Sequence, residues 1–166
     1  MHNCSYYPLE RIVKMDNQLI MYKESDFDEC VRIYCDAFNA PPLNYDWLTE
    51  SKAMRYIGDL TRTPGFMGYT YWMDGEMIGF CFGILDNYFE GSMFEVEELA
   101  VSGKFHRQGI GTIVMQLLEK KLAGYAVAAI SLQTSRNLPA FNFYLKNDYE
   151  EVHENVTLMK LLGDCQ

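Results

Sequence analysis

The sequence predicts an α/β fold whose central sheet is mixed and need not be wholly parallel, and three observations support this prediction. The apolar-rich run 92–101 is followed by a short polar link, two glycines and an amphipathic helix pattern that ends near Leu122. Asp74-Gly75 separates two further apolar runs, which is typical of a β-hairpin. Strand and helix patterns follow in the order β-α-α-β-β-β-α-β-α-β-β, which favours about six to seven strands flanked by about four helices.

The first part of the chain is expected to supply one strand and two helices. Residues 19–22 are apolar enough for a strand, and Ser25 or Asp26 can cap the helix that follows. The prolines of Asn39-Ala40-Pro41-Pro42 end that helix, and a second helix is expected over residues 46–60. The expected inner faces are Phe27, Val31, Tyr34, Cys35 and Phe38 in the first helix, and Trp47, Leu48, Met54 and Ile57 in the second.

The rest of the chain is expected to complete the sheet. Strands are predicted over 66–73, 77–85, 92–101 and 128–133, and Gly124 stands near the expected end of the central helix. Asn137 can cap a short helix that has Pro139 in its first turn. Two closing strands are expected over 149–152 and 156–161.

Composition indicates one globular domain. The chain has 166 residues, of which 49% are hydrophobic and 22% are charged, and it contains no internal repeat or low-complexity linker. We therefore expect a single domain over residues 1–166. Residues 1–16 show no clear period and are expected to be an N-terminal extension; if Met15 is the natural start, the first fourteen residues precede it.

Charge and cysteine content exclude several functional classes. The formal net charge of -9 argues against a nucleic-acid surface and is compatible with a cationic substrate. The five cysteines and three histidines are scattered without metal-ligand spacing, so we expect no metal. There is no signal-peptide pattern and no apolar run near the roughly 20 residues of a membrane span. A cytoplasmic protein that does not bind a membrane is expected.

The glycine turn at Gln108-Gly109-Ile110-Gly111 stands where a helix begins, and unpaired N–H groups there can bind an anion. A Rossmann fingerprint would need a third glycine at Val114, and a Walker loop would need Gly-Lys-Ser/Thr where the chain has Gly111-Thr112-Ile113. Both motifs are excluded. From the turn alone, an anion cradle and a helix start that merely packs closely stay open as alternatives.

The segment HRQGIG, preceded by EELAV, resembles the acetyl-CoA-binding motif of the GNAT family of N-acetyltransferases. The resemblance continues through SLQTSRN and AFNFYLKNDY, and it spans residues 19–161. The chain departs from the family pattern in two places. His106 stands where the family has Arg or Gln, with Arg107 one place later, and Asp148 stands where the family usually has glycine. Asp tolerates the left-handed conformation, so the turn at Asp148 should be kept.

The resemblance implies an acetyl-CoA-dependent N-acetyltransferase. The acetyl group would pass from coenzyme A, as co-substrate, to a primary amine of a small cationic acceptor by direct attack in a ternary complex. The alternatives are a non-catalytic acyl-CoA-binding or sensing module of the same fold, or a protein N-terminal or lysine acetyltransferase. The expected partner is a small-molecule amine, and a homodimer is left open.

The resemblance also implies which residues carry the reaction. Glu95 and Glu97 alternate onto one face of their strand and match the family's positions for the base, and Glu97 is favoured because it lies nearer the strand end. Glu98 should face the other way unless a bulge intervenes. Tyr144 matches the family's acid near the coenzyme sulfur. Residues expected to bind the coenzyme are Leu99 and Val101 through their backbone, Arg107, Gln108, Gly109, Ile110, Gly111 and Thr112 at the turn, and Asn137 and Lys146.

An aromatic and acidic lining is expected for the acceptor. In this family the acceptor pocket uses the first two helices, their link and the loop after the third strand, which here carry Phe38, Tyr45, Trp47 and Tyr88. Ring faces attract cations, so these residues suit a cationic amine.

Overall fold

The computed structural model describes residues 17–41, 43–45, 48–88, 91–160 and 162, and for Tyr88 the backbone alone. The chain divides into two compact units, the first ending at Gln133 and the second beginning at Thr134. Each unit is described here by itself, and the single domain stays a prediction. The expected N-terminal extension, the first two residues of the helix predicted over 46–60, and Leu161 lie outside the described residues.

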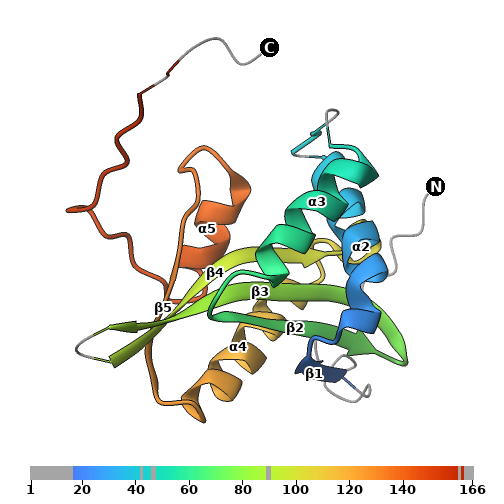
Figure 1. Ribbon diagram of the computed structural model, residues 1–166, viewed down its shortest axis with the longest axis horizontal. Coiled ribbons are helices and arrows are strands. Elements are labelled where there is room, and N and C mark those ends of the chain that lie inside the picture. The colour runs from blue at the N-terminus through green and yellow to red at the C-terminus, as the bar shows by residue number, and fades with distance from the viewer. Residues whose placement is uncertain (1–16, 42, 46–47, 89–90, 161, 163–166) are drawn as a thin grey trace. The chain divides into compact units, whose positions relative to one another are not determined.

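The first unit is built on a mixed sheet in which the strands lie in chain order (Figure 1). The strands are β1 (Asn17–Met21), β2 (Phe66–Met73), β3 (Glu76–Tyr88), β4 (Gly91–Val101) and β5 (Val127–Leu132). Neighbours from β1 to β4 are antiparallel, whereas β4 and β5 are parallel. The mixed α/β sheet is confirmed, but the predicted count of six to seven strands is wrong, because the described residues form five.

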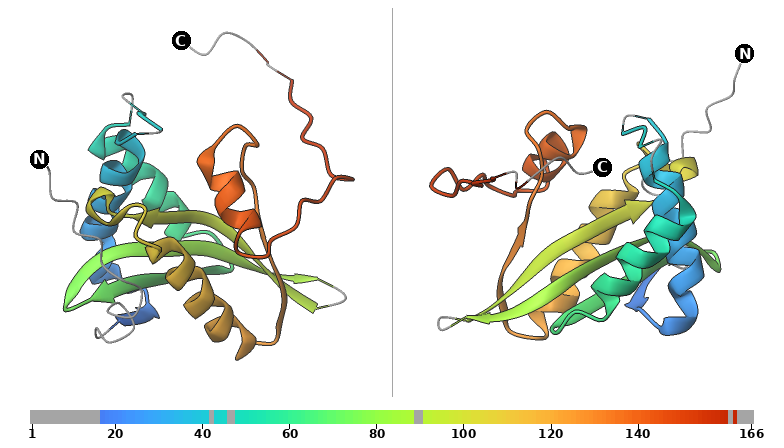
Figure 2. Two further views of the ribbon diagram at one scale, coloured as in Figure 1. Left: turned by 180° about the vertical axis from the view of Figure 1, so that it is seen from behind. Right: turned by 45° about the horizontal axis from the view of Figure 1, so that its top comes forward.

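Helices cover both faces of this sheet (Figure 2). The 3₁₀ turn η1 (Glu24–Asp26), α2 (Phe27–Asn39) and α3 (Glu50–Thr61) precede the β2–β3 hairpin, while η2 (Gly103–Phe105) and α4 (Ile110–Ala123) follow β4. Helices α2 and α3 lie on one face and α4 lies on the other. The β4–turn–α4 unit therefore forms as its sequence predicts.

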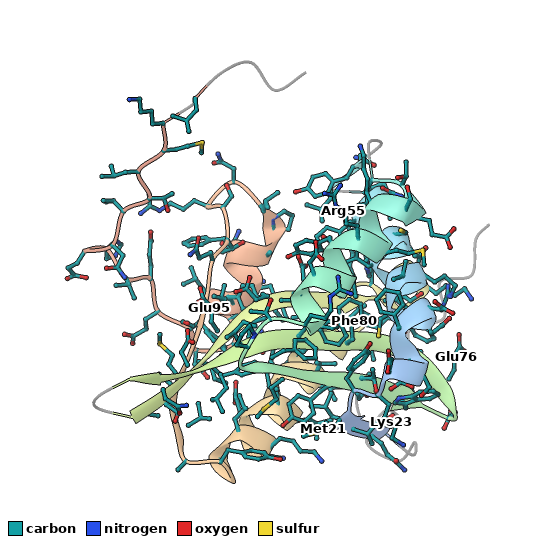
Figure 3. All side chains as sticks on the ribbon, in the orientation of Figure 1. Met21, Lys23, Arg55, Glu76, Phe80 and Glu95 are labelled. Atoms are coloured by element: carbon teal, nitrogen blue, oxygen red, sulfur yellow. The ribbon has the colours of Figure 1, made fainter. Side chains whose placement is uncertain are left out.

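One hydrophobic core lies between the sheet and helices α2 and α3. Phe80 and Phe82 of β3 are fully buried there, with Ile33 of α2 and Ile57 of α3. Figure 3 labels Phe80 on the sheet. Burying each such side chain stabilises the fold by roughly 1.5–3 kcal/mol. Helix α3 begins later than predicted because the Thr49 side chain accepts a hydrogen bond from the Lys52 N–H and caps it.

Two details of the predicted helix faces are corrected. Met54 was expected to face inward, but it is 42% exposed, and the residues of α3 buried with Ile57 are Ala53, Gly58 and Leu60. The later start of α3 places Leu48 ahead of the helix, where it is still buried. Asn39 ends α2 as expected, with Ala40 already extended.

The second unit contains α5 (Pro139–Leu145), which has proline in its first turn as predicted. Its N-cap is Leu138 and not Asn137. Asp148 adopts the left-handed conformation, with φ of 64°. The Tyr149 N–H donates to the Tyr144 carbonyl and the Asp148 N–H to the Leu145 carbonyl, which together form a Schellman motif. The turn expected at Asp148 is thus confirmed.

The two closing strands are the main error in the predicted fold. Residues 149–152 and 156–160 form no strand in the described chain, and Val156 and Leu158 are 77% and 90% exposed. Alternation of apolar and polar residues favours a strand only where a neighbouring strand satisfies its backbone groups. An ion pair between Arg136 and Glu151 ties the start of this segment to the loop before α5.

Candidate active site

The glycine turn forms an open helix start at the end of β4. Gly109 is the N-cap of α4 and adopts φ of 80°, a left-handed conformation that favours glycine. The Ile113 N–H donates to the Gly109 carbonyl and makes the first bond of the helix. The N–H groups of residues 110–112 precede that bond, so helix geometry leaves them without a partner inside the helix. Such a start suits an anion.

Two polar side chains of the loop before α4, those of His106 and Gln108, bind to backbone carbonyls at the end of β4 and in the loop itself, and so hold the loop. The His106 Nε2 lies 2.7 Å from the Val101 carbonyl oxygen, which can only accept, so this ring nitrogen carries the proton. The Gln108 side chain donates to the Lys104 carbonyl at 2.9 Å. These contacts fix the path of the loop and engage the side chains of His106 and Gln108.

Asp36 of α2 fastens the beginning of the same loop. One of its carboxylate oxygens accepts from the Ser102 hydroxyl at 2.9 Å and from the Gly103 N–H at 2.7 Å. Burial alone would raise the pKa of Asp36, but these two hydrogen bonds, with Arg32 and His106 nearby, hold it below its usual range. The sequence offered no sign of this contact, which joins residues 66 and 67 positions apart.

Two cationic residues of the loop, Lys104 and Arg107, are exposed to solvent, and Arg107 is the nearer of the two to the start of α4. The φ of Arg107 is 59°, which lies in the left-handed region. Because His106 is engaged with Val101, the geometry favours Arg107 as the cation for a bound phosphate.

The end of β4 runs on beyond its parallel neighbour. The last pair between β4 and β5 joins Val96 to Leu132, whereas Leu99 and Val101 pair with Cys81 and Gly79 of β3. On its β5 side, the edge of β4 beyond Val96 therefore pairs with no strand among the described residues. An extended chain with amide groups could add to this edge.

A β-bulge in β4 changes which way its glutamates face. Glu98 pairs with Phe82, but the next pair joins Val96 to Gly83, so Glu97 is the extra residue. Glu95 pairs with Ile84, two residues from Phe82, so Glu95 and Glu98 share the sheet face that α2 and α3 cover. Strict alternation would place Glu95 and Glu97 on this face and Glu98 on the opposite one, whereas the bulge places Glu98 on this face.

Glu98 is the most strongly perturbed carboxyl group of the described chain. Its Oε1 accepts hydrogen bonds from the Tyr56 hydroxyl of α3 at 2.8 Å and from the Tyr34 hydroxyl of α2 at 3.4 Å. Burial raises the pKa of Glu98 to about 7, although both tyrosine hydrogen bonds act in the opposite direction. A group with this pKa changes its charge near neutral pH. Glu98 is not among the site residues predicted from the sequence, because no local sequence pattern indicates a β-bulge.

Glu97 is the most open of the three glutamates, because it is exposed whereas Glu95 and Glu98 are half-buried. The pKa of Glu97 is raised above its usual value. The main cause is the partial burial of its carboxyl group, and the negative charges of Glu95 and Asp86 add to it. Figure 3 labels Glu95 to the left of Phe80, which lies nearer the centre of the sheet. The three carboxylates make this part of the sheet strongly acidic.

A row of aromatic rings extends from Glu98 along α2. The ring centroids of Tyr56 and Tyr34 lie 5.8 Å apart, those of Tyr34 and Phe38 4.4 Å apart, and those of Phe38 and Tyr45 5.9 Å apart. Of the four residues expected to line the acceptor pocket, Phe38 and Tyr45 are therefore brought together. Trp47 and the side chain of Tyr88 lie outside the described residues.

The remaining predicted site residues belong to the second unit. Tyr144 lies in α5 with its ring 4.9 Å from that of Phe143 and 5.6 Å from that of Tyr149. Lys146 follows the helix and Asn137 precedes its N-cap. Their roles stay predictions.

Neither a metal centre nor a membrane span appears in the described residues. No group of three or more His, Cys, Asp or Glu side chains in those ranges could hold a metal ion, and Cys30, Cys35 and Cys81 are free thiols. Among the described helices, none combines the length and apolarity required to cross a bilayer.

Known structures resemble this fold over most of their length. A possible acetyltransferase from Clostridium difficile 630 superposes with a TM-score of 0.72 at 10% identity, covering 89% of this chain and 99% of the other. An aminoglycoside acetyltransferase from an uncultured soil metagenomic sample, in complex with sisomicin, gives 0.66 at 14% identity and covers 89% and 97%. The aminoglycoside N-acetyltransferase AAC(6')-Iy, in complex with CoA, gives 0.64 at 11% identity and covers 88% and 95%. At these identities the likeness shows the fold alone.

The family assignment rests on the sequence. No curated protein matches the chain. The model of the acetyltransferase (GNAT) family matches residues 27–149, which include α2, the whole sheet from β2 to β5, the glycine turn and α5. The chain therefore belongs to the acetyltransferase (GNAT) family.

Proposed function

We propose that the protein is an acetyl-CoA-dependent N-acetyltransferase that acetylates a primary amine of a small cationic acceptor in a ternary complex. The observation that carries the proposal is the run from β4 into α4. One strand bears the acidic face and leads directly into a helix start with open N–H groups. Family members use acetyl-CoA, and relatives with this fold include aminoglycoside acetyltransferases, which act on small-molecule amines.

The coenzyme is proposed to bind along the loop and the β4 edge. Its pyrophosphate would lie on the N–H groups of residues 107–112, with Arg107 pairing with a phosphate. Its amide-bearing arm would add to the edge of β4 at Leu99 and Val101, beyond the last pair with β5. A backbone N–H there would stabilise the oxyanion that forms on the thioester carbonyl.

The acceptor is proposed to bind over the acidic and aromatic face. Glu97 and Glu95 would meet its ammonium group, attract it and begin its deprotonation, directly or through water. Phe38 and Tyr45 offer ring faces to a cation. Tyr144 is proposed to protonate the leaving thiolate, a role taken from the resemblance of its segment. Asn137 and Lys146 are proposed to contact the coenzyme.

A thiol-release assay over a panel of amines tests the proposal. The purified chain is incubated with acetyl-CoA and, in turn, with aminoglycosides, polyamines, simple alkyl amines and amino acids, and free coenzyme A is measured. Mass spectrometry of the acceptor should show a gain of one acetyl group on nitrogen. Binding of acetyl-CoA by calorimetry without thiol release from any amine would instead favour the non-catalytic module.

A further inference from the structure

Glu98 is connected to the solvent side of the fold by a tyrosine. Tyr34 is only 8% exposed, whereas Tyr56 is 40% exposed and its hydroxyl is the nearer donor to Glu98. Tyr56 thus reaches from the surface of α3 to a largely buried carboxyl group. Both hydroxyls contact the same oxygen, Oε1, so Glu98 is held in place from two helices.

The titratable groups that act on the charge of Glu98 come from three elements. They are Tyr34 of α2, Tyr56 of α3 and Glu97 of β4 itself. Cys81 of β3, whose pKa the Glu98 charge helps to raise, alternates onto the opposite face of the sheet. Within the described ranges none of these groups is a cation, so nothing fixes Glu98 as a permanent carboxylate. A buried ion pair is therefore not the role of this residue, and a proton can be gained or lost.

We propose that Glu98 receives the proton that the acceptor's ammonium group loses, and that the Tyr56 hydroxyl passes this proton to it. The inference rests on the proposed function but revises one part of it, because the ammonium proton goes through Tyr56 to Glu98 and not to Glu95 or Glu97. Glu95 and Glu97 attract the cation at the open face, and Glu98 holds the proton behind Tyr56. Tyr34 is a positioning residue that keeps Glu98 in place.

The proton balance is complete without a further reactant. The ammonium nitrogen gives one proton to the Tyr56 oxygen, while the Tyr56 proton moves to Glu98 Oε1 and turns its carboxylate into a carboxylic acid. The neutral amine then attacks the thioester carbon, the C–N bond forms and the C–S bond breaks. The thiolate takes a proton from the Tyr144 hydroxyl, as proposed above, and the second nitrogen proton replaces the one that Tyr144 gives. Glu98 finally loses its proton to solvent.

The environment of Glu98 suits this task. A base is most effective when its pKa lies near the working pH. Burial raises the pKa of Glu98 to about 7, closer to the pKa of an alkyl ammonium group than an ordinary carboxyl group comes. Activity should need Glu98 ionised, so kcat/KM should fall as the pH drops through this value.

The test combines two measurements on the full chain. Carbon-13 NMR of glutamate-labelled protein follows each carboxyl group through a pH titration without any acceptor. The pH profile of kcat/KM is then measured at saturating acetyl-CoA with the amine that reacts fastest in the panel. Calorimetry with acetyl-CoA checks that each variant binds coenzyme as the wild type does.

Each variant has its own expected signature. Glu98→Gln should remove both the NMR titration near pH 7 and the acidic limb, and lower kcat by about 10²-fold. Tyr56→Phe should lower kcat by about tenfold and move the limb to higher pH, because its hydrogen bond lowers the pKa of Glu98. Tyr34→Phe should cause a smaller upward shift, since its bond is longer. Glu97→Gln should move the limb to lower pH, because the Glu97 charge raises the same pKa.

Tyr125→Phe is the matched control, since its hydroxyl interacts with Tyr69 and not with Glu98. It should leave kcat and the limb unchanged. A wild-type limb in both Glu98→Gln and Tyr56→Phe would overturn the inference while acetyl transfer stands. If Glu98→Gln fails to fold, Tyr56→Phe alone decides, because Tyr56 is partly exposed. A wild type that releases no thiol with any amine would refute the proposed function, and the inference with it.

Discussion

Arg107 combines a backbone strain with a proposed ligand role, and substitutions can separate the two. A non-glycine residue in the left-handed region costs roughly 1 kcal/mol, and Arg107 has φ of 59°. Both Arg107→Gly and Arg107→Ala remove the guanidinium, but only glycine also relieves the strain. We expect both variants to raise the KM for acetyl-CoA by about tenfold, as the loss of one phosphate contact implies.

Stability then distinguishes the two variants. Thermal unfolding should show a free energy of unfolding about 1 kcal/mol higher for Arg107→Gly than for Arg107→Ala, which corresponds to roughly 2–4 °C in Tm for a chain of this size. An unchanged KM in Arg107→Ala would remove Arg107 from the coenzyme site, whatever the Tm.

Tyr144 is tested by removing its hydroxyl alone. Tyr144→Phe keeps the ring that packs near Phe143 and Tyr149. If the hydroxyl protonates the thiolate in the slow step, kcat should fall by roughly 10²-fold with little change in the KM of either substrate. Tyr149→Phe is the neighbouring control. If steady-state kinetics give a wild-type kcat for Tyr144→Phe, Tyr144 is not the acid and serves only to pack its ring in α5.

At the scale of the element, sequence predicts best where structure is local. The hairpin around Asp74 and the strand–turn–helix around Gly109 follow from patterns within a few residues, and both form as expected. The bulge at Glu97 depends on the register between β3 and β4, which the sequence of β4 alone does not specify. The closing strands failed for a related reason, because their alternation needs a neighbouring strand. The missed site residues Glu98, Tyr34 and Tyr56 meet only through such long-range packing.

The contact between Asp36 and the loop after β4 joins α2 to the proposed coenzyme site. Asp36→Asn keeps an oxygen that can accept from Ser102 and Gly103 but loses the charge that strengthens both bonds. Because Asp36 is exposed, we expect a stability loss of only about 1 kcal/mol. The looser loop should raise the KM for acetyl-CoA several-fold and leave kcat near wild type.

The same contact should give a defined pH dependence of stability. The pKa of Asp36 is lowered in the folded protein, so its contribution is present above the ordinary value of about 4 and is lost as the pH falls below it. Denaturant unfolding should therefore give a higher free energy of unfolding for the wild type than for Asp36→Asn at pH 6. This difference should become smaller toward pH 3. A difference that is constant with pH would contradict the charge-assisted bonds.

The N-terminus of α4 can be tested against the other end of the same helix. Gly111→Val places a branched side chain among the open N–H groups of the first turn, so the KM for acetyl-CoA should rise at least tenfold with the fold kept. Gly124→Val makes the same change at the C-cap, where φ of −70° suits any residue, although the added Cβ would lie 3.3 Å from the Lys121 carbonyl oxygen and require a small local shift. Coenzyme affinity in calorimetry should change only in the first variant. Equal affinities in both would place the pyrophosphate elsewhere.

At the scale of the whole molecule, the charge acts in opposite directions on the two proposed substrates. The formal net charge of -9 repels the anionic coenzyme and attracts a cationic amine. The open helix start and Arg107 supply a local positive potential for the phosphates, so coenzyme binding relies on short-range contacts. The acceptor, in contrast, should experience the field of the acidic face from a distance.

This difference predicts how salt affects the two substrates. Raising the ionic strength from about 0.02 M to 0.3 M shortens the Debye length from roughly 20 Å to below 10 Å and screens long-range attraction. At saturating acetyl-CoA, kcat/KM for a cationic acceptor should fall several-fold. A doubly charged amine should lose more than a singly charged one, because steering scales with its charge. Stopped-flow or initial-rate thiol release with two acceptors of equal size and different charge measures the two slopes. Equal slopes would mean that the acidic face acts only through direct contact with the bound amine.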